Sequence, residues 1–203
     1  GAAPAAAAPG AASGIRTLQV RPNIYMLTGA GGNITVMTFP QGVLVVDTGS
    51  AQMANTVLET IKRLSDKPIA HIINTSAFAD HVGGNETLAT SGRRIPVEVV
   101  AGEGLMVVAH ENVMTRMSAP TGKQALVPAN ALPTDTYHRD FFKLSEWFNG
   151  EPIIAYHEPA AYTDGDSIVF FRHSEVISAG EILSTVSYPV IDLAKGGSIN
   201  GVI

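Results

Sequence analysis

The sequence predicts an α/β sandwich in which helices pack on the outside of β-sheets. Short β-rich runs bounded by Gly, Pro and Asn alternate with segments whose apolar residues recur at helical spacing. These runs do not follow a strict strand–helix–strand repeat, and such an order favours layered sheets covered by helices. With 203 residues, of which 45% are hydrophobic and 15% charged, one compact domain is expected.

Residues 1–14 differ in composition from the rest of the chain, because Ala, Gly and Pro make up almost the whole segment. Such small residues cannot build a core and proline breaks helices, so we expect a disordered tether. The segment resembles what remains after signal-peptide cleavage, which favours a periplasmic or secreted location and leaves a cytoplasmic one open. The folded domain is therefore expected at residues 15–203.

The first half of the domain is expected to begin with a meander of strands, followed by a helix. The β-rich runs occupy residues 17–20, 23–28, 33–39 and 42–47. Ser50 is a candidate N-cap for the helix, and Pro68 marks its end. The apolar face of the helix would consist of Met53, Val57, Leu58, Ile61 and Leu64, which recur at a spacing of three to four.

The remainder of the domain continues the alternation of strands and helices. We expect a strand at residues 69–74, a glycine-rich loop, a short helix near 85–90, a strand at 97–101, a helix at 104–117 and a surface loop at 118–130. The chain then returns to strands, at residues 141–144, 152–157, 167–172 and 175–179.

Charge and composition exclude several classes of protein. The net charge is −5 and no run of Lys and Arg occurs, so a nucleic-acid partner is not expected. The longest apolar runs, residues 42–46 and 168–171, are far shorter than the roughly 20 residues that span a membrane. The chain has no cysteine, which excludes disulfides, thiolate metal sites and cysteine nucleophiles.

The most informative stretch, residues 73–85, reads INTSAFADHVGGN and lies where an apolar strand ends in a glycine-rich loop. Side chains at such strand ends commonly face ligands. On the residues alone, Asp80 and His81 fit a metal-binding or acid–base pair, and they fit a capped turn equally well.

This stretch resembles the His-x-His-x-Asp-His motif of the metallo-β-lactamase superfamily, in its common setting INTHxHxDHxGGN. Other blocks agree with the family in order and spacing: residues 31–33 with 43–49, 109–113, 159–166 (PAAYTDGD) and 178–181 (SAGE). The resemblance runs from about residue 17 to residue 203. It implies the family's αβ/βα sandwich, with two mixed sheets and helices outside, and the family's zinc-dependent hydrolysis.

The resemblance also implies where zinc ligands would stand. In the family, one metal is held by the first two histidines of the motif and by the histidine of an AHTDGD block, and the matching residues here are Ser76, Phe78 and Tyr162. A phenyl ring cannot ligate zinc, and neutral hydroxyls are poor ligands beside imidazole or carboxylate. We therefore expect the first site to hold no metal.

For the second family site, the resemblance leaves Asp80, His81 and Glu181, and the family's final histidine has no counterpart. We expect weak binding there: no required cofactor, and zinc only at low occupancy. Asp80 is the candidate catalytic residue. His157 lies five residues before Tyr162 and is a candidate relocated ligand. The other histidines are expected to stand singly in structural roles, and Asp47 to be a turn carboxylate that accepts backbone N–H groups.

Three functions remain open at this point. The first is a metallo-β-lactamase-fold protein with decayed zinc ligands and no metallohydrolase activity. The second is a β-lactamase-like hydrolase that uses one metal, and the third is a module that binds a small molecule in the vacated site.

The resemblance further implies that residues 197–203 open a helix, after which the family continues. The apolar faces of the last strands would then need cover, either from a missing C-terminal segment or from a second copy of the chain.

Overall fold

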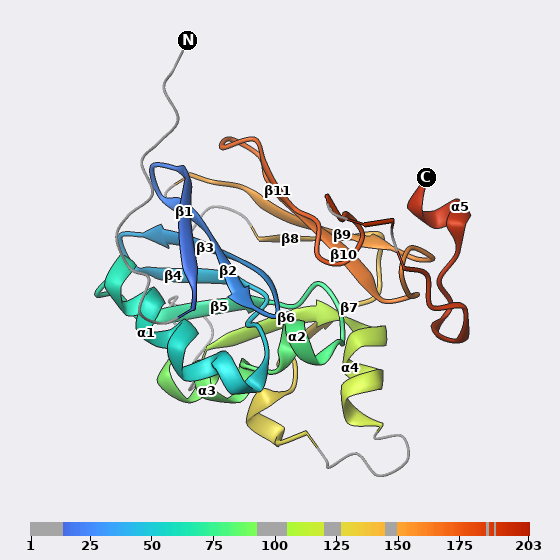
Figure 1. Ribbon diagram of the computed structural model, residues 1–203, viewed down its shortest axis with the longest axis horizontal. Coiled ribbons are helices and arrows are strands. Elements are labelled where there is room, and N and C mark those ends of the chain that lie inside the picture. The colour runs from blue at the N-terminus through green and yellow to red at the C-terminus, as the bar shows by residue number, and fades with distance from the viewer. Residues whose placement is uncertain (1–13, 93–104, 120–126, 145–149, 186, 189) are drawn as a thin grey trace.

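The computed structural model describes residues 14–92, 105–119, 127–144, 150–185, 187–188 and 190–203. Within them the chain forms two facing β-sheets with helices on the outer side of the first (Figure 1). This arrangement confirms the predicted α/β sandwich. The segment expected to be a tether lies outside the described residues except for Gly14.

The first sheet is mixed and has the order β1-β2-β3-β4-β5-β6-β7. An antiparallel meander forms one half, and β4 to β7 are parallel. The strands are β1 (Arg16–Arg21), β2 (Ile24–Ala30), β3 (Gly32–Phe39), β4 (Gly42–Val46), β5 (Ile69–Ile73), β6 (Met106–His110) and β7 (Asp135–Tyr137).

The second sheet has the order β11-β10-β9-β8, and every pairing in it is antiparallel. Its strands are β8 (Phe141–Leu144), β9 (Ile153–Glu158), β10 (Asp166–Phe171) and β11 (Val176–Ser178). The resemblance implies that both sheets are mixed. Among the described strands, only the first sheet combines parallel and antiparallel pairs.

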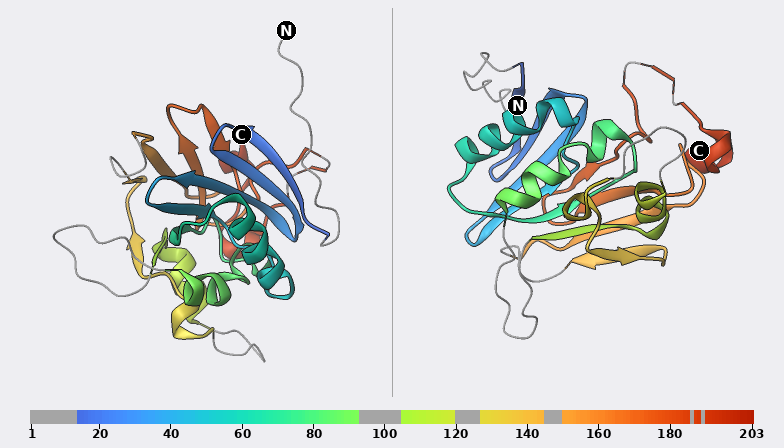
Figure 2. Two further views of the ribbon diagram at one scale, coloured as in Figure 1. Left: turned by 90° about the vertical axis from the view of Figure 1, so that its left-hand side faces the viewer. Right: turned by 90° about the horizontal axis from the view of Figure 1, so that it is seen from below.

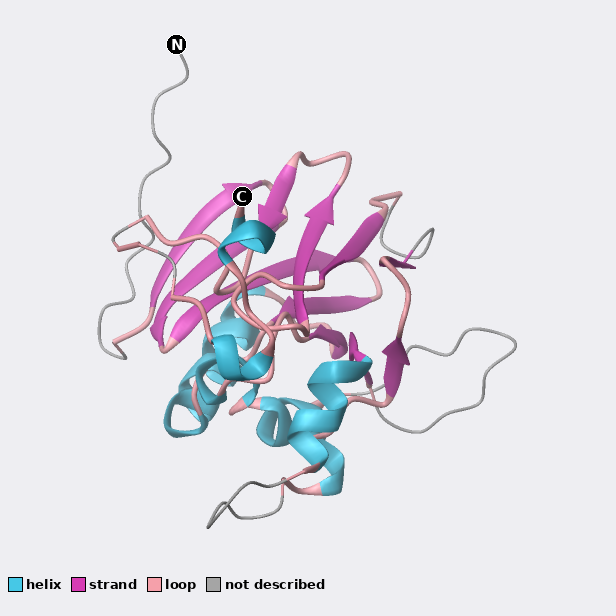
Figure 3. Cartoon of the chain, turned by 90° about the vertical axis from the view of Figure 1, so that its right-hand side faces the viewer, coloured by secondary structure: helices cyan, strands magenta, loops and turns pink. Residues whose placement is uncertain are grey.

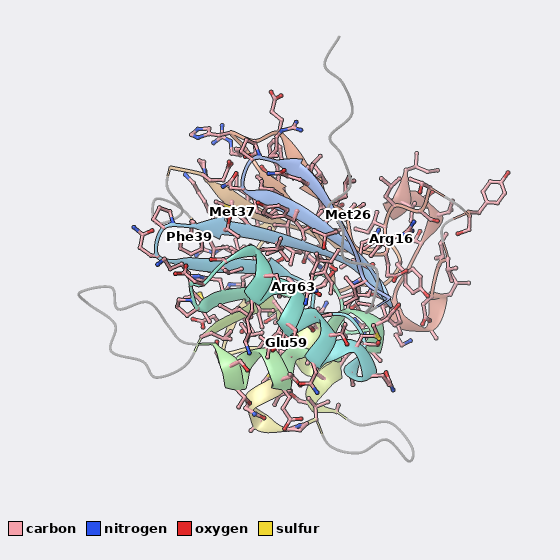
Figure 4. The ribbon with its side chains drawn as sticks, turned by 60° about the vertical axis from the view of Figure 1, so that its left-hand side comes forward. Arg16, Met26, Met37, Phe39, Glu59 and Arg63 are labelled. Carbon is pink, nitrogen blue, oxygen red and sulfur yellow. The ribbon has the colours of Figure 1, made fainter. Side chains whose placement is uncertain are left out.

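The helices are α1 (Ala54–Leu64), α2 (Ala79–Val82), α3 (Asn85–Ser91), α4 (Glu111–Ser118) and α5 (Ile199–Val202), with 3-10 turns at Ala51–Met53, Ala129–Ala131 and Leu193–Lys195. Figure 2 and Figure 3 show the longer helices gathered on one side of the strands, with the short α5 apart from them. Figure 4 labels Glu59 and Arg63 on the outward side of α1. Among the described helices, none has the length and apolar character that a membrane crossing requires.

Two apolar cores lie on the two faces of the first sheet, and β4 contributes to both. Val43 and Val45 pack with Val57 of α1, whereas Leu44 and Val46 face the second sheet. Because both faces of β4 are covered, its sequence is a continuous apolar run rather than an alternating one.

The helix predicted at residues 104–117 is wrong in its first half. Met106–His110 is strand β6, and only Glu111–Ser118 is helical. A short buried apolar run has no period that separates a strand from a helix, and here pairing with β5 and β7 decides. Strand β7 was not predicted, because its three residues are too few for a pattern. The strand expected at 97–101 lies outside the described residues.

The start predicted for the first helix also needs correction. Ser50 precedes a 3-10 turn and its side chain makes no capping hydrogen bond, so α1 begins at Ala54. The helix ends at Leu64, before Pro68.

The second sheet has one face covered by the first sheet and one partly open face, on which Ile154 is still buried. Ile153, Val169 and Phe171 are fully buried against the first sheet. On the other face Phe141, with 53% of its surface exposed, and Ile177, with 62%, contact solvent. The cover expected for this face, either a further C-terminal segment or a second copy of the chain, stays a prediction.

Candidate functional site

The candidate site lies at the carboxyl ends of β4 and β5, which are parallel and so end at the same edge of the sheet. Asp47 follows β4 directly and adopts a left-handed backbone conformation, with φ of 62°. The backbone N–H of Thr48 donates to the carbonyl of His81 at 2.7 Å, which joins the turn after β4 to α2. A Cβ at Gly84 would lie 2.5 Å from the carbonyl oxygen of Thr48, so this close packing requires glycine.

His81 is held between two carboxylates. Its Nδ1 lies 2.7 Å from Oδ2 of Asp47, and its Nε2 lies 2.5 Å from Oε1 of Glu181. Burial opposes the charge of the imidazole, because only 2% of its side chain is exposed, but the two carboxylates outweigh this effect and raise the pKa of His81 to about 11. His81 is therefore an imidazolium at neutral pH, and it donates to both carboxylates.

Asp47 makes more contacts than the sequence predicts for a turn carboxylate. Its Oδ1 accepts the backbone N–H of Thr75 at 2.8 Å, as expected. Its Oδ2 also accepts the Thr75 hydroxyl at 2.6 Å and faces His81. No spacing pattern indicates this pairing, because 34 positions separate Asp47 from His81.

Asp80, His81 and Glu181 each offer one ligand atom, and these atoms lie within 4.8 Å of one another. Glu181 follows β11 of the second sheet, so the group joins the two sheets. Two carboxylates and one imidazole can hold a divalent cation, but Nε2 of His81, which donates to Glu181, would first have to lose its proton.

The positions that match the first zinc site of the family hold two aromatic rings and a buried serine in place of histidines. The rings of Phe78 and Tyr162 meet edge to face, with centroids 4.8 Å apart. The ammonium Nζ of Lys195 lies 5.0 Å from the centroid of the Phe78 ring. Ser76 is buried, and its Oγ accepts the backbone N–H of Phe78 at 3.4 Å. Lys195 has no counterpart among the residues singled out in the sequence.

Burial, together with nearby carboxylates, keeps the phenol of Tyr162 protonated. Burial raises the pKa of this phenol, and the carboxylates of Glu181 and Asp192 raise it further, while Lys195 lowers it. A neutral phenol is a poor zinc ligand.

The sequence model of the metallo-beta-lactamase superfamily matches residues 27–193. The chain belongs to the metallo-β-lactamase superfamily. This confirms the family inferred from the motif blocks, and the two-sheet arrangement agrees with the fold of that superfamily.

Known proteins resemble this chain both in sequence and in structure. A linear primary-alkylsulfatase from Pseudomonas sp. (strain ATCC 19151) is 35% identical over 192 residues, covering 77% of this chain. The chain spans about a third of that relative's length, since 34% of the relative is covered.

Solved structures show the shared fold. A metallo-β-lactamase from Pontibacter korlensis superposes with a TM-score of 0.69 at 15% identity, covering 93% of this chain and 81% of that one. A metallo-β-lactamase with a HARLDQ motif from Cronobacter sakazakii superposes with a TM-score of 0.60 at 22% identity, covering 86% and 65%.

His157 lies outside the group formed by Asp80, His81 and Glu181. Its Nε2 donates to the carbonyl oxygen of Asp164 at 2.8 Å, and its ring stacks on that of His110 with centroids 3.5 Å apart. The sequence, in which these histidines occur singly, did not indicate that His110 and His157 stack on each other. The stacked pair joins β6 to β9. Its two histidines are 47 positions apart in the sequence, so no local pattern indicates the contact.

Proposed function

We propose that this chain is a metallo-β-lactamase-fold protein with decayed zinc ligands that lacks metallohydrolase activity. The observation that carries the proposal is the contact between Phe78 and Tyr162 beneath the ammonium of Lys195. These two residues match family zinc ligands, and neither supplies a group that zinc prefers.

Charge at these positions supports the same conclusion. A cation beside Phe78 would meet the positive charge of Lys195, whose Nζ is 5.0 Å from the ring. Ser76 and Tyr162 offer only neutral hydroxyls, and a structural or catalytic zinc centre needs at least three good protein ligands. When zinc is bound in a hydrolase, it activates water and polarises the scissile group. The residues at these positions offer no substitute for that chemistry.

A second candidate is a hydrolase that uses one metal at Asp80, His81 and Glu181, with Asp80 as the catalytic carboxylate. It is favoured by the convergence of three ligand atoms within 4.8 Å. The name of the alkylsulfatase relative makes a linear alkyl sulfate the first substrate to test.

The third candidate, a module for a small organic ligand, rests on the half-buried rings of Phe78 and Tyr162. A hollow of about 950 Å³ exists elsewhere, between the end of α1 and the turn before β4, and neither ring lines it. This hollow therefore does not support the third candidate.

Hydrolysis assays separate the first two candidates. The natural chain and an Asp80→Asn variant would be assayed with a β-lactam and with a linear alkyl sulfate, each with and without added zinc. The proposal expects equal, background rates for both proteins under all conditions. Turnover that requires zinc and disappears in Asp80→Asn would contradict it and establish the single-metal hydrolase.

A further inference from the structure

The rings of Phe78 and Tyr162 form a small aromatic surface that already carries a cation. Their centroids lie 4.8 Å apart at an interplanar angle of 75°, and Nζ of Lys195 lies 5.0 Å from the centroid of the Phe78 ring. A cation within about 6 Å of an aromatic centroid is attracted by the negative charge density above the ring. The ammonium of Lys195 therefore shows which kind of group this surface accepts.

The backbone that presents these side chains is held by hydrogen bonds. Phe78 directly precedes α2 as its N-cap residue. The carbonyl of Tyr162 accepts the N–H of Asp192 at 2.9 Å, and the carbonyl of Lys195 accepts the N–H of Asp164 at 2.9 Å. The segment that carries Lys195 is thus fastened to the loop that carries Tyr162, and the two rings keep their places when the lysine side chain moves.

The side chain of Lys195 can leave the ring without disturbing that backbone. It is 44% exposed, and its Nζ also contacts Oδ2 of Asp192 at 2.6 Å, so the ammonium keeps a partner when the contact with Phe78 is lost. The lysine stem is a flexible chain of four carbons. Lys195 therefore occupies the ring as a displaceable group.

The charge around the rings favours a cationic ligand over an anionic one. Burial raises the pKa of the Tyr162 phenol, and the nearby carboxylates of Glu181, Asp192 and Asp80 raise it further. Glu181 is balanced by the imidazolium that it contacts, and Lys195 supplies one positive charge against Asp80 and Asp192. Among the described residues around the rings, negative charge therefore exceeds positive charge, which attracts cations.

We propose that Phe78 and Tyr162 form a binding site for an organic ammonium ion, and that Lys195 occupies this site when the ligand is absent. Aromatic faces are the surfaces on which proteins recognise quaternary ammonium groups. The inference rests on the proposed function, because the ring face is open to an ammonium ion only where no metal is bound. It gives the small-molecule module a ligand class.

The test is a nuclear magnetic resonance titration of the 203-residue chain with tetramethylammonium chloride, at constant ionic strength and with a chelator present. Neutral tert-butanol has a similar branched shape and lacks the charge. We expect tetramethylammonium to bind at least about fivefold more tightly than tert-butanol, because only the ion gains from the ring's charge distribution.

Two variants should change this affinity in opposite directions. Phe78→Leu keeps an apolar side chain and removes the ring, so it should weaken tetramethylammonium binding about fivefold and leave tert-butanol binding unchanged. Lys195→Met keeps an unbranched side chain and removes the competing ammonium, so it should strengthen tetramethylammonium binding about fivefold. Because Lys195 is exposed, its variant tests the proposal even where Phe78→Leu fails to show a cooperative melt.

A matched control is Phe141→Leu on β8. Phe141 is 53% exposed and forms a looser aromatic pair with Tyr156, with centroids 6.3 Å apart. This variant removes an aromatic ring of the same kind at a distance from Lys195, so it should leave the affinity for tetramethylammonium unchanged.

Several results would overturn the inference. They are equal affinities for tetramethylammonium and tert-butanol, no binding of the ion at tens of millimolar, or weaker binding of the ion by Lys195→Met. Binding of methyl sulfate that is lost in Lys195→Met would assign the lysine to an anionic ligand instead. All of these results leave the proposed function standing, whereas zinc-dependent turnover in the hydrolysis assays would overturn the proposed function whatever the ammonium affinity.

Discussion

Nε2 of His81 lies 2.5 Å from Oε1 of Glu181, a residue 100 positions further along the chain. The contact joins α2, at the edge of the first sheet, to the loop that follows β11 of the second. On its other side the same ring faces Asp47. His81 therefore connects the two layers of the sandwich, and its charge matters to the stability of the fold.

The first prediction concerns the dependence of stability on pH. The pKa of His81 is raised from 6.5 to about 11 by Asp47 and Glu181, against the opposing effect of burial. A raised pKa means that the folded chain holds a proton which the unfolded chain releases above pH 6.5. The stabilisation is thus complete below pH 6.5 and declines as pH rises toward 11.

Urea denaturation with a chelator present, from pH 6 to pH 10, measures this decline. A His81→Gln variant should lose the corresponding slope, while His138→Gln, at an exposed position, should keep it. Identical pH profiles for the natural chain and His81→Gln would show that His81 carries no extra proton.

The second prediction concerns Asp47, which accepts two hydrogen bonds from Thr75 and faces His81. Asp47→Asn leaves the buried imidazolium without the more deeply buried of its two carboxylate partners, and removing one partner of a buried pair costs about 3 kcal/mol or more. Glu59→Gln breaks an exposed ion pair with Lys62 and should cost about 0.5 kcal/mol or less. The free energy of unfolding at pH 7 gives both values, and equal losses would refute the prediction.

The third prediction is restoration of the first metal site. The combined substitutions Ser76→His, Phe78→His and Tyr162→His should recover zinc binding, whereas each single substitution should add little, because one imidazole cannot complete the site. Isothermal titration with Zn²⁺ gives the stoichiometry. A folded triple variant that takes up no additional zinc would indicate that the backbone no longer supports the site.

The fourth prediction follows from the open face of the second sheet, where Phe141 and Ile177 are exposed. An apolar sheet face in water favours association, so light scattering should report species larger than the 21.3 kDa monomer. Ile177→Lys should shift them toward the monomer. Leu18→Lys, at a 45% exposed position on β1, should not. A monodisperse monomer of the natural chain would contradict the prediction.

The sequence was sufficient for the fold, because motif blocks such as residues 73–85 are local patterns tied to strand ends. It failed where long-range packing decides. Met106–His110 became a strand only through its pairing with β5 and β7. Likewise, tertiary packing brings His110 onto His157 and Lys195 over Phe78. The spacing of these residues in the sequence does not indicate either contact.

We expect the positions of Ser76, Phe78 and Tyr162 to hold no metal. Anomalous scattering from crystals of the natural chain grown with zinc decides this, because it locates each bound ion. We predict no peak within coordination distance of Ser76 and Tyr162, and at most one peak, among Asp80, His81 and Glu181. A peak coordinated by Ser76 and Tyr162 would show that the first zinc site is still functional.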